Sequence, residues 1–470
     1  MKNYKMAWRN LWRNRRRTVI TIASVLFAVF FALLMRSMQL GTYAYMFNNI
    51  IESYSGHIQI QNEDFWEDRT VDNSFANSQL LTEKLLADEN VSSAIPRFES
   101  FALASSGSRT KGVMVMGIDP ARESELSDVE SKLVKYTLSD KAITALDKED
   151  LPDKVKSNMH IFNGNSYASD GRILLDLGVK GKDTGQVLPL LKKFAAVDNS
   201  YLTLGEPGAL VGNRLAGYLG LQKGDTIVLL GQGYHGTTAA GKYEIKGVVS
   251  LPAPDLESQI VYLPVSICQD LYGAEGMLTS VVLRLKKMGE EDINSTISRL
   301  DEKLEAPYRV LGWKEMNETI VQQMEADNQS GMIMIGILYL VIAFGVFGTV
   351  LMMTAERKRE FGVIIAIGMQ KVKMATVLVI EMLYIGLAGI LMGVIVSTPV
   401  IIYGFYHPIR LSGEMAKMME DYGFEPVMAF QWIDNYFLWQ SVVVGIIVIL
   451  SLFYPVRKIL RLKEINAIKA

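Results

Sequence analysis

Four long apolar runs divide this sequence, and clustered Lys and Arg residues lie at their ends. A bilayer core of about 30 Å requires around 20 consecutive helical residues, because a backbone group left unpaired in hydrocarbon costs several kcal/mol. No other segment of the chain is long enough to meet this requirement. We therefore predict transmembrane helices at residues 19–40, 331–354, 374–403 and 437–456.

The basic residues predict the orientation of these helices, because Lys and Arg near the ends of spans stay in the cytoplasm. They gather in three segments, 1–18, 355–373 and 457–470, which we assign to the cytoplasm. The residues are Arg9, Arg13, Arg15, Arg16, Arg17, Arg357, Lys358, Arg359, Lys371, Lys373, Arg457, Lys458, Arg461 and Lys463. Both termini are then cytoplasmic, whereas residues 41–330 and the shorter loop 404–436 face outward.

A cleaved secretory signal is the alternative interpretation of the N-terminus, since it also has a basic start and an apolar middle. Here the apolar run is longer than in a typical signal, and no small-residue cleavage site follows it. We expect the first run to remain as a membrane helix.

Composition excludes several classes of function. The formal net charge of -2 is too small to indicate nucleic-acid binding, so the basic residues act locally, on topology and on membrane lipids. The single cysteine, Cys268, excludes an intrachain disulfide and a cysteine-based zinc site. We expect Cys268 to be a buried, unreactive thiol.

The large outward segment has the patterns of a folded α+β domain inserted between the first two membrane helices. Alternating apolar residues predict strands, and the spacing of Ile293, Ile297, Leu300 and Leu304 predicts a helix over 291–304. The predicted strands are His57–Gln61, Val113–Ile118, Thr226–Leu230, Tyr243–Val249, Gln259–Leu263 and Ser280–Leu285.

Two further features of this segment concern its organisation. Residues 119–200 are richer in charged and loop-forming residues, with few clear strands, and we interpret them as an inserted subdomain. Residues 39–53 and 314–329 are compatible with helix, so we expect the first two membrane helices to continue outward as a stalk.

A phosphate-binding loop must be considered at Gly236–Lys242, which has the glycine and lysine spacing of a P-loop. However, Tyr243 stands where a hydroxyl for magnesium is needed, and the next residues alternate like a strand instead of opening a helix. We interpret the segment as a glycine-rich hairpin turn.

The four histidines also lack metal-ligand spacing. We therefore expect no enzyme activity, cofactor or metal in this chain.

The loop between the second and third spans has alternating charges beside an apolar stretch. On a short helix these charges would form a docking surface for another protein; the alternative is a basic loop that only sets topology. The candidate residues are Glu356, Arg357, Lys358, Arg359, Glu360, Phe361 and Gly362.

At these residues the sequence resembles the FtsX-like permeases of ABC transporters, which include lipoprotein-releasing and macrolide-exporting families. The shared pattern also includes Ala366 and Gly368. Similarity continues in the opening AWRNLWRNRRRT, in SGHIQIQ, in GALVGNRLAGYLGLQKGDTIVLL and in the tail YPVRKILRLKEINAIKA. The chain departs from the pattern at Ile364 and Ile365, where many relatives have a basic residue, and at Met369, where many have Ala.

The resemblance implies a type VII ABC permease in a bacterial inner membrane, with its large domain in the periplasm. It implies two partners, a cytoplasmic ABC ATPase subunit that binds ATP and magnesium, and a second permease subunit, identical or different. The branch it favours is lipoprotein release, with a lipoprotein carrier as a further partner. The alternatives are export of a drug, peptide or toxin with a periplasmic adaptor, and a cargo-free regulator that mechanically activates a cell-wall hydrolase.

Glu381 is the one acidic residue well inside the third span. It lies about 10 to 15 Å deep at a rise of about 1.5 Å per residue, where a bare carboxylate is costly. We interpret it as a buried polar contact that couples the loop helix to the span or to a dimer interface; the alternative is a protonated or snorkelling acid near a helix start. Gly386, Gly389 and Gly393 follow at helical spacing and predict close helix packing.

The short outer loop contains several methionines among acidic residues. Flexible thioethers suit apolar contacts of varied shape, so binding of lipid is one interpretation, and packing against the outer domain is the favoured one. The residues are Met415, Met418, Met419 and Met428.

Overall fold

The computed structural model describes residues 2–13, 15–179, 181–411, 413–421 and 424–461. The chain forms two compact units. The first, which we call the helical unit, comprises Met1–Tyr45, Thr319–Ser412 and Val427–Ala470. The second, which we call the sheet unit, comprises Met46–Glu318 and Gly413–Pro426.

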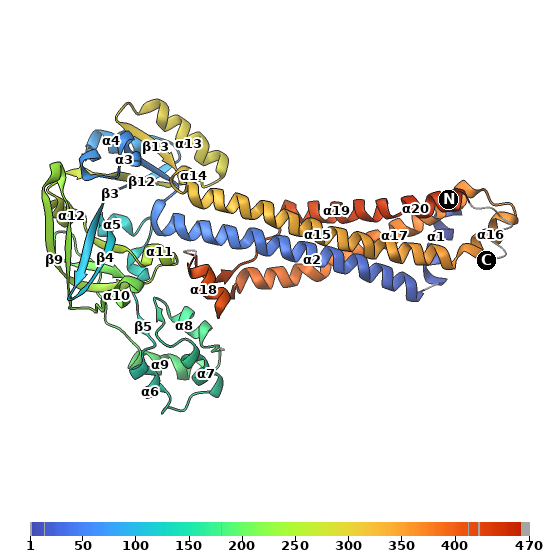
Figure 1. The fold of residues 1–470 in the computed structure, drawn as a ribbon, viewed down its shortest axis with the longest axis horizontal. Coiled ribbons are helices and arrows are strands. Elements are labelled where there is room, and N and C mark those ends of the chain that lie inside the picture. The colour runs from blue at the N-terminus through green and yellow to red at the C-terminus, as the bar shows by residue number, and fades with distance from the viewer. Residues whose placement is uncertain (1, 14, 180, 412, 422–423, 462–470) are drawn as a thin grey trace. The chain divides into compact units, whose positions relative to one another are not determined.

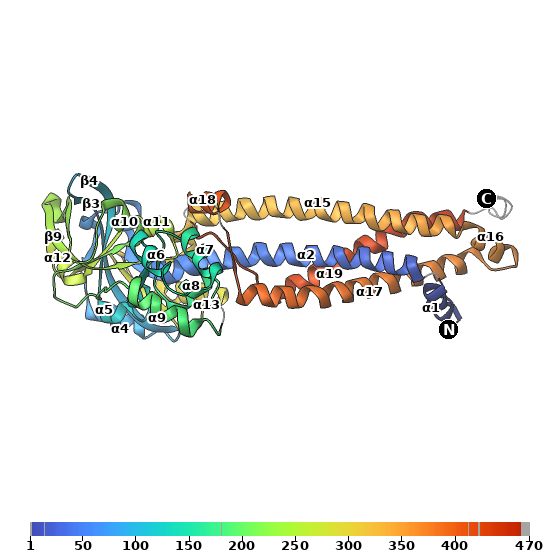
Figure 2. The same ribbon diagram turned by 90° about the horizontal axis from the view of Figure 1, so that it is seen from below.

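Four helical segments in the described part of the chain are long and apolar enough to cross a membrane. They run side by side in both views (Figures 1 and 2). These segments are α2 (Arg15–Ile50), α15 (Glu318–Glu356), α17 (Lys371–Tyr406), and α19 (Asn435–Ser451) followed by α20 (Phe453–Leu460). Each predicted apolar run lies within one of them.

The shorter elements of the helical unit are grouped at the ends of these helices. They are α1 (Lys2–Arg13), α16 (Lys358–Ala366) and the paired strands β14 (Ile409–Arg410) and β15 (Val427–Met428). Inside the unit, apolar residues of all the long helices form one buried cluster, which includes Val29, Val350, Leu378 and Val444.

The fourth span differs from its prediction as one uninterrupted helix over 437–456. The helix ends at Ser451, and α20 begins at Phe453. Pro455 explains the break, because proline has no N–H to donate and its ring clashes with the carbonyl four residues earlier, which is that of Ser451. Lys463 of the basic tail lies outside the described residues.

The helical continuations beyond the first two spans are present, with one interruption. The first helix extends to Ile50, and a π-helical turn, η1 (Ile51–Ser55), follows it. On the other side, α14 (Trp313–Met316) stops at Asn317, whose side-chain amide donates to the Trp313 carbonyl at 2.8 Å, and α15 starts anew at Glu318. The action of these helices as a stalk stays a prediction.

One mixed sheet of nine strands organises the sheet unit, in the order β13-β1-β12-β3-β4-β10-β7-β9-β8. The last strand also pairs with β3, so β3, β4, β10, β7, β9 and β8 close into a barrel. The bounds are β1 (Ile58–Asn62), β3 (Val91–Ser106), β4 (Arg109–Ile118), β7 (Ala209–Gly212), β8 (Thr226–Gln232), β9 (Thr238–Val249), β10 (Ile260–Pro264), β12 (Ser280–Leu285) and β13 (Tyr308–Gly312). The six predicted strands are confirmed, with small differences at their ends.

Helices pack against this sheet in two places. The barrel core includes residues of α10 (Asn213–Leu219) and α12 (Val265–Tyr272), and a second core lies where α4 (Gln79–Leu86) and the predicted helix α13 (Glu290–Lys303) pack on β1 and β12. The remaining short elements are α3 (Glu63–Glu67), η2 (Val71–Asn73), β2 (Phe75–Ala76), α11 (Pro254–Glu257) and β11 (Met277–Leu278).

Residues 119–200 are more helical than their composition indicated. They have a core of their own, because Leu146, Val155, Ile173 and Leu191 are buried against one another. The elements are α5 (Pro120–Glu123), η3 (Val129–Lys132), β5 (Tyr136–Thr137), α6 (Asp140–Leu146), α7 (Asp153–Ile161), β6 (Ser166–Tyr167), α8 (Asp170–Asp176) and α9 (Thr184–Phe194).

Two interpretations of single residues and motifs are settled by the sheet unit. The glycine-rich segment Gly236–Lys242 begins in the turn between β8 and β9, which pair antiparallel, and continues into β9 from Thr238; the short 3-10 turn η4 (Tyr234–Gly236) lies between the strands. It is therefore a hairpin, as predicted.

Cys268 is fully buried in the barrel core, and burial raises the pKa of its thiol, so the expectation of a buried thiol is confirmed.

A buried ion pair joins the end of η1 to the sheet. The Arg97 guanidinium on β3 is inaccessible to solvent and donates to both carboxylate oxygens of Glu123, which is equally buried. It also donates to the backbone carbonyl of Tyr54, whose hydroxyl donates to Glu99 at 2.8 Å. Burial alone would lower the pKa of Arg97, but the charge of Glu123 and its hydrogen bonds outweigh burial and raise this pKa above its ordinary value. One side chain thus fixes η1, β3 and α5 to one another.

Breaking this pair on one side should destabilise the sheet unit. Arg97→Met leaves Glu123 buried without a partner, and we expect the free energy of unfolding to fall by about 3–5 kcal/mol. The double variant Arg97→Met/Glu123→Leu removes both charges and should lose less than either single variant. Chemical denaturation of the detergent-solubilised chain, followed by tryptophan fluorescence, checks this; a double variant as unstable as the sum of the single ones would contradict it.

Candidate coupling site

The corner between the second and third spans is formed by a change of helix direction at Arg357. The helix α15 ends at Glu356 and α16 starts at Lys358, with Arg357 between them at φ -92° and ψ 7°. Its carbonyl still accepts the N–H of Phe361 at 2.9 Å, so the new helix begins directly from this residue.

Arg357 is bound to Glu381, the acid of the third span. The exposed fractions of the two residues are only 6% and 3%. Nη1 of Arg357 donates to both carboxylate oxygens of Glu381, at 2.7 and 2.8 Å. Each charge alone would be costly here, and together each supplies the other's hydrogen bonds. The predicted polar contact between the loop helix and the span is therefore present, whereas its role in coupling stays a prediction.

The same arginine has two further contacts within the loop. Its Nε lies 3.5 Å from an oxygen of Glu360, and its guanidinium lies 5.2 Å from the centre of the Phe361 ring. Glu360 also accepts a hydrogen bond from Arg13 of α1. Alternating charges thus connect Arg13, Glu360, Arg357 and Glu381, and they join α1, α16 and α17. No sequence pattern predicted the contact of Arg13 with Glu360; its only predicted role was in topology.

The predicted docking surface is only partly exposed. Of the seven candidate coupling residues, Arg357, Phe361 and Gly362 are buried, and their role in docking stays a prediction. Residues 357, 361 and 365 share one face of α16, and this face packs inward because Arg357 must reach Glu381. The residues with exposed side chains are Glu356, Arg359 and Glu360, with Lys358 half-buried.

An apolar tip, which sequence reasoning missed, completes the exposed face of α16. Ile367 follows the helix and is 81% exposed, and Val363 one turn earlier is 41% exposed. Gly368 then turns the chain at φ +108°, a conformation that favours glycine. Ile367 and Val363 thus form a small exposed apolar surface beside the charged residues of α16.

The glycines of the third span allow close contact with its neighbours. A Cβ atom on Gly389 would lie 2.6 Å from Cβ of Val25, and one on Gly393 would lie 2.7 Å from Cβ of Val29. Gly386 faces α19 in the same way. These positions therefore bring α17 against α2 and α19 at a distance that no larger side chain permits.

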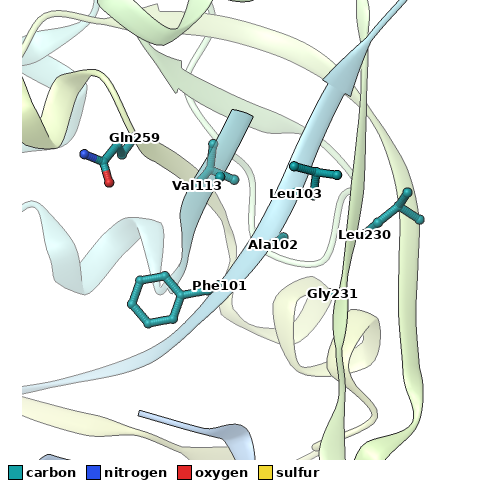
Figure 3. Close-up of a pocket in the computed structure, with 8 residues that line it drawn as sticks. Phe101, Ala102, Leu103, Val113, Leu230, Gly231 and Gln259 are labelled. Carbon is teal, nitrogen blue, oxygen red and sulfur yellow. The ribbon is translucent and has the colours of Figure 1, made fainter. Parts of the chain in front are cut away.

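An open pocket of about 430 Å³ with both polar and apolar lining lies on the barrel of the sheet unit (Figure 3). Its rim includes Phe101 and Leu103 of β3 and Leu230 of β8, which are 52%, 45% and 45% exposed. Leu103 and Leu230 are direct cross-strand partners. On its other side, Leu103 is paired with Gly112, whose missing side chain leaves space beside it.

The methionine-containing loop is fixed to the sheet unit by a charge and not by its methionines. Glu425 pairs with Arg172 of α8 and accepts from the Asn49 amide at 3.4 Å. On α18 (Glu414–Asp421), Met415 and Met418 are more than half exposed. The favoured expectation that these two side chains pack against the outer domain is therefore wrong.

Comparison with known proteins finds a family match within the helical unit. Residues 332–463 match the family described as FtsX-like permease C-terminal. This segment contains α16, Glu381 and the three glycines of α17.

Two curated relatives are both named lipoprotein-releasing system transmembrane protein LolC. The protein from Xylella fastidiosa strain Temecula1 is 24% identical over 216 residues, which are 44% of this chain and 51% of the relative. The protein from strain 9a5c is 24% identical over 222 residues, which are 46% of this chain and 52% of the relative. The chain thus spans about half the length of the curated relatives it matches.

Two solved structures show more distant similarity. The periplasmic region of MacB from Actinobacillus actinomycetemcomitans is 14% identical, with 59% of this chain and 96% of that one covered and a TM-score of 0.29. The extracellular domain of the ABC-type transporter YknZ from Gram-positive bacteria is 12% identical, with 55% and 100% covered and a TM-score of 0.28. The family match and the curated relatives identify this chain as one that carries an FtsX-like permease domain, and they confirm the family resemblance that its motifs predicted.

Proposed function

We propose that this chain is the membrane-spanning subunit of a type VII ABC transporter that converts ATP hydrolysis by a separate ATPase subunit into movement of its extracytoplasmic domain. The observation that carries the proposal is the family match over residues 332–463. Within that segment, α16 offers charged residues and an apolar tip, while its inner face is tied to the third span.

The orientation that this function needs is supported by the placement of basic residues. The elements α1, α16 and α20 lie at the same end of the helical unit (Figure 1), and Arg13 contacts Glu360 there. Lys and Arg of these elements favour the cytoplasmic side. We therefore propose that both termini are cytoplasmic and that the sheet unit is periplasmic, in a bacterial inner membrane.

A second permease subunit is part of the proposal. Gly345 and Gly348 lie on the exposed side of α15, where nothing within 4 Å would meet a side chain. Small residues let a second helix approach closely in a membrane. This side of α15 is our candidate surface for the other subunit.

Lipoprotein release is the cargo class that the curated relatives favour, because both are named for it. An acyl chain needs an apolar surface outside the membrane. The pocket rim formed by Phe101, Leu103 and Leu230 is our candidate for that surface.

Changing the polarity or the charge of the exposed face of α16 should abolish ATPase binding. We expect Ile367→Glu and Arg359→Glu, each alone, to prevent co-purification with the ATPase subunit, because the first places a charge in an apolar contact and the second reverses a charge. Membrane insertion should be unchanged. Ile409→Glu, a half-exposed isoleucine beyond the far end of α17, is the matched control. Retained binding in both tip variants would rule out this docking surface.

Removing the charge of Glu381 should weaken coupling. Glu381→Gln cannot neutralise Arg357, and loss of a charge-assisted contact of about 1.5–3 kcal/mol should lower cargo-stimulated ATPase activity about tenfold or more. Arg357→Lys, which keeps the charge but has a single nitrogen donor, should be less affected. Activity and thermal stability are measured on the same preparations. A lower melting temperature with normal stimulation would assign the pair a structural role only.

Cargo should contact the barrel rim. A photocrosslinking amino acid at Leu103 should capture an acylated protein in native membranes, which mass spectrometry identifies. The same group at Leu80, an exposed leucine of α4 outside the pocket, is the control. Equal capture at both positions would show that the pocket has no special role.

A further inference from the structure

The N-terminal helix α1 carries two parallel bands of side chains on its exposed surface. Tyr4, Trp8 and Trp12 recur every four residues and are 59%, 53% and 56% exposed. Next to them, Lys5, Arg9 and Arg13 recur at the same spacing and are also exposed. Residues four apart share one face of a helix, so an aromatic band and a basic band lie side by side.

The opposite surface of α1 is already occupied. Ala7 and Leu11 are buried, and Leu11 belongs to the same apolar cluster as Met374 and Leu378 of α17. The Trp8 ring also meets the Tyr384 ring edge-on, with centroids 5.8 Å apart. The helix is therefore held against the third span, with Trp8 at the edge of this contact, and the rest of the two bands is exposed.

The charged residues of α1 itself are all basic. The first acidic residue of the chain is Glu52, so no carboxylate lies near the basic band in sequence. Arg13 is bound by Glu360. Among the residues that the structure describes, Lys5 and Arg9 have no ion-pair partner. These two cations are available to an anionic surface.

The character of both bands fits one partner, an acidic lipid surface. Tyr and Trp favour the level of the headgroups, where the ring is in apolar surroundings and the polar atom is hydrated, and Lys and Arg bind lipid phosphates. The surface also continues into the lipid-facing side of α2, where Val19 and Ile20 are half-exposed or more. A protein groove would require neither this continuity nor three aromatic rings in line.

We propose that α1 is an interfacial helix that binds acidic phospholipids of the inner leaflet through Lys5 and Arg9, with Tyr4, Trp8 and Trp12 at the headgroup boundary. The inference rests on the orientation given under Proposed function. Because Arg13 of the same helix binds Glu360, the lipid contact is one ion pair away from α16.

The test uses the full chain with Trp432→Phe and Trp439→Phe, so that Trp8 and Trp12 are the tryptophans closest to the bilayer. It is placed in lipid nanodiscs of mixed phosphatidylcholine and phosphatidylglycerol, with bromine on the acyl chains of one lipid or the other. We expect brominated phosphatidylglycerol to quench tryptophan fluorescence at least 1.5-fold more than the same amount of brominated phosphatidylcholine. Lys5→Gln/Arg9→Gln should make the two equal.

The matched control is Lys141→Gln/Lys148→Gln, which removes two exposed cations of the sheet unit and should leave the difference unchanged. Equal quenching by both lipids in the unmodified basic band would overturn the proposal. The proposal would also be overturned if neither brominated lipid quenched the fluorescence and Lys5→Gln/Arg9→Gln no longer co-purified with the ATPase. That outcome would assign the basic band to the protein partner.

Failure of the orientation is detected separately. The variants Asn10→Cys and Thr237→Cys are each treated with a membrane-impermeant thiol reagent in intact cells. The native Cys268 does not interfere, because it is buried. Labelling of Asn10→Cys from outside would overturn the orientation and this inference with it. Labelling of Thr237→Cys alone, combined with equal quenching, would overturn only the lipid site.

Discussion

The contact between Arg357 and Glu381 is the interaction on which the arrangement of the corner between α15 and α16 depends. Neither charge is tolerable alone at a buried position inside a membrane protein, so the two must stay together. Because Arg357 stands where α15 stops and α16 starts, the contact also fixes the direction of α16. This direction determines which face of α16 is buried. Phe361 lies on the buried face, and Arg359, Glu360 and the apolar tip lie on the exposed face.

Most of the membrane part could be predicted from the sequence because one physical requirement, about 20 apolar residues per span, leaves few alternatives. The break at Ser451 was also predictable in principle, since Pro455 cannot continue the hydrogen-bond ladder. In the sheet unit, strands with one polar face were found by alternation. The long strand β3 was missed because Pro96, Arg97 and Glu99 argue against a central strand, and only the distant Glu123 makes Arg97 acceptable there.

The candidate site shows the same division between local and long-range information. The charges of the loop and the unusual Glu381 were visible in the sequence, and so was the spacing that places residues 357, 361 and 365 on one face. Their pairing was not, because nothing local indicates which arginine reaches across 24 positions to the acid. The contact of Arg13 with Glu360 spans 347 positions and depends on the packing of α1 against α17.

In both units a buried arginine holds the end of a helical segment, and the two contacts share the same chemistry. Arg97 binds the carbonyl of Tyr54 in η1 and the carboxylate of Glu123, and Arg357 caps the corner after α15 while it binds Glu381. Apolar contacts are non-directional and allow helices to slide. A bidentate ion pair has a fixed geometry and a high cost of separation. Helix ends held in this way keep a fixed position relative to the element to which they are bound.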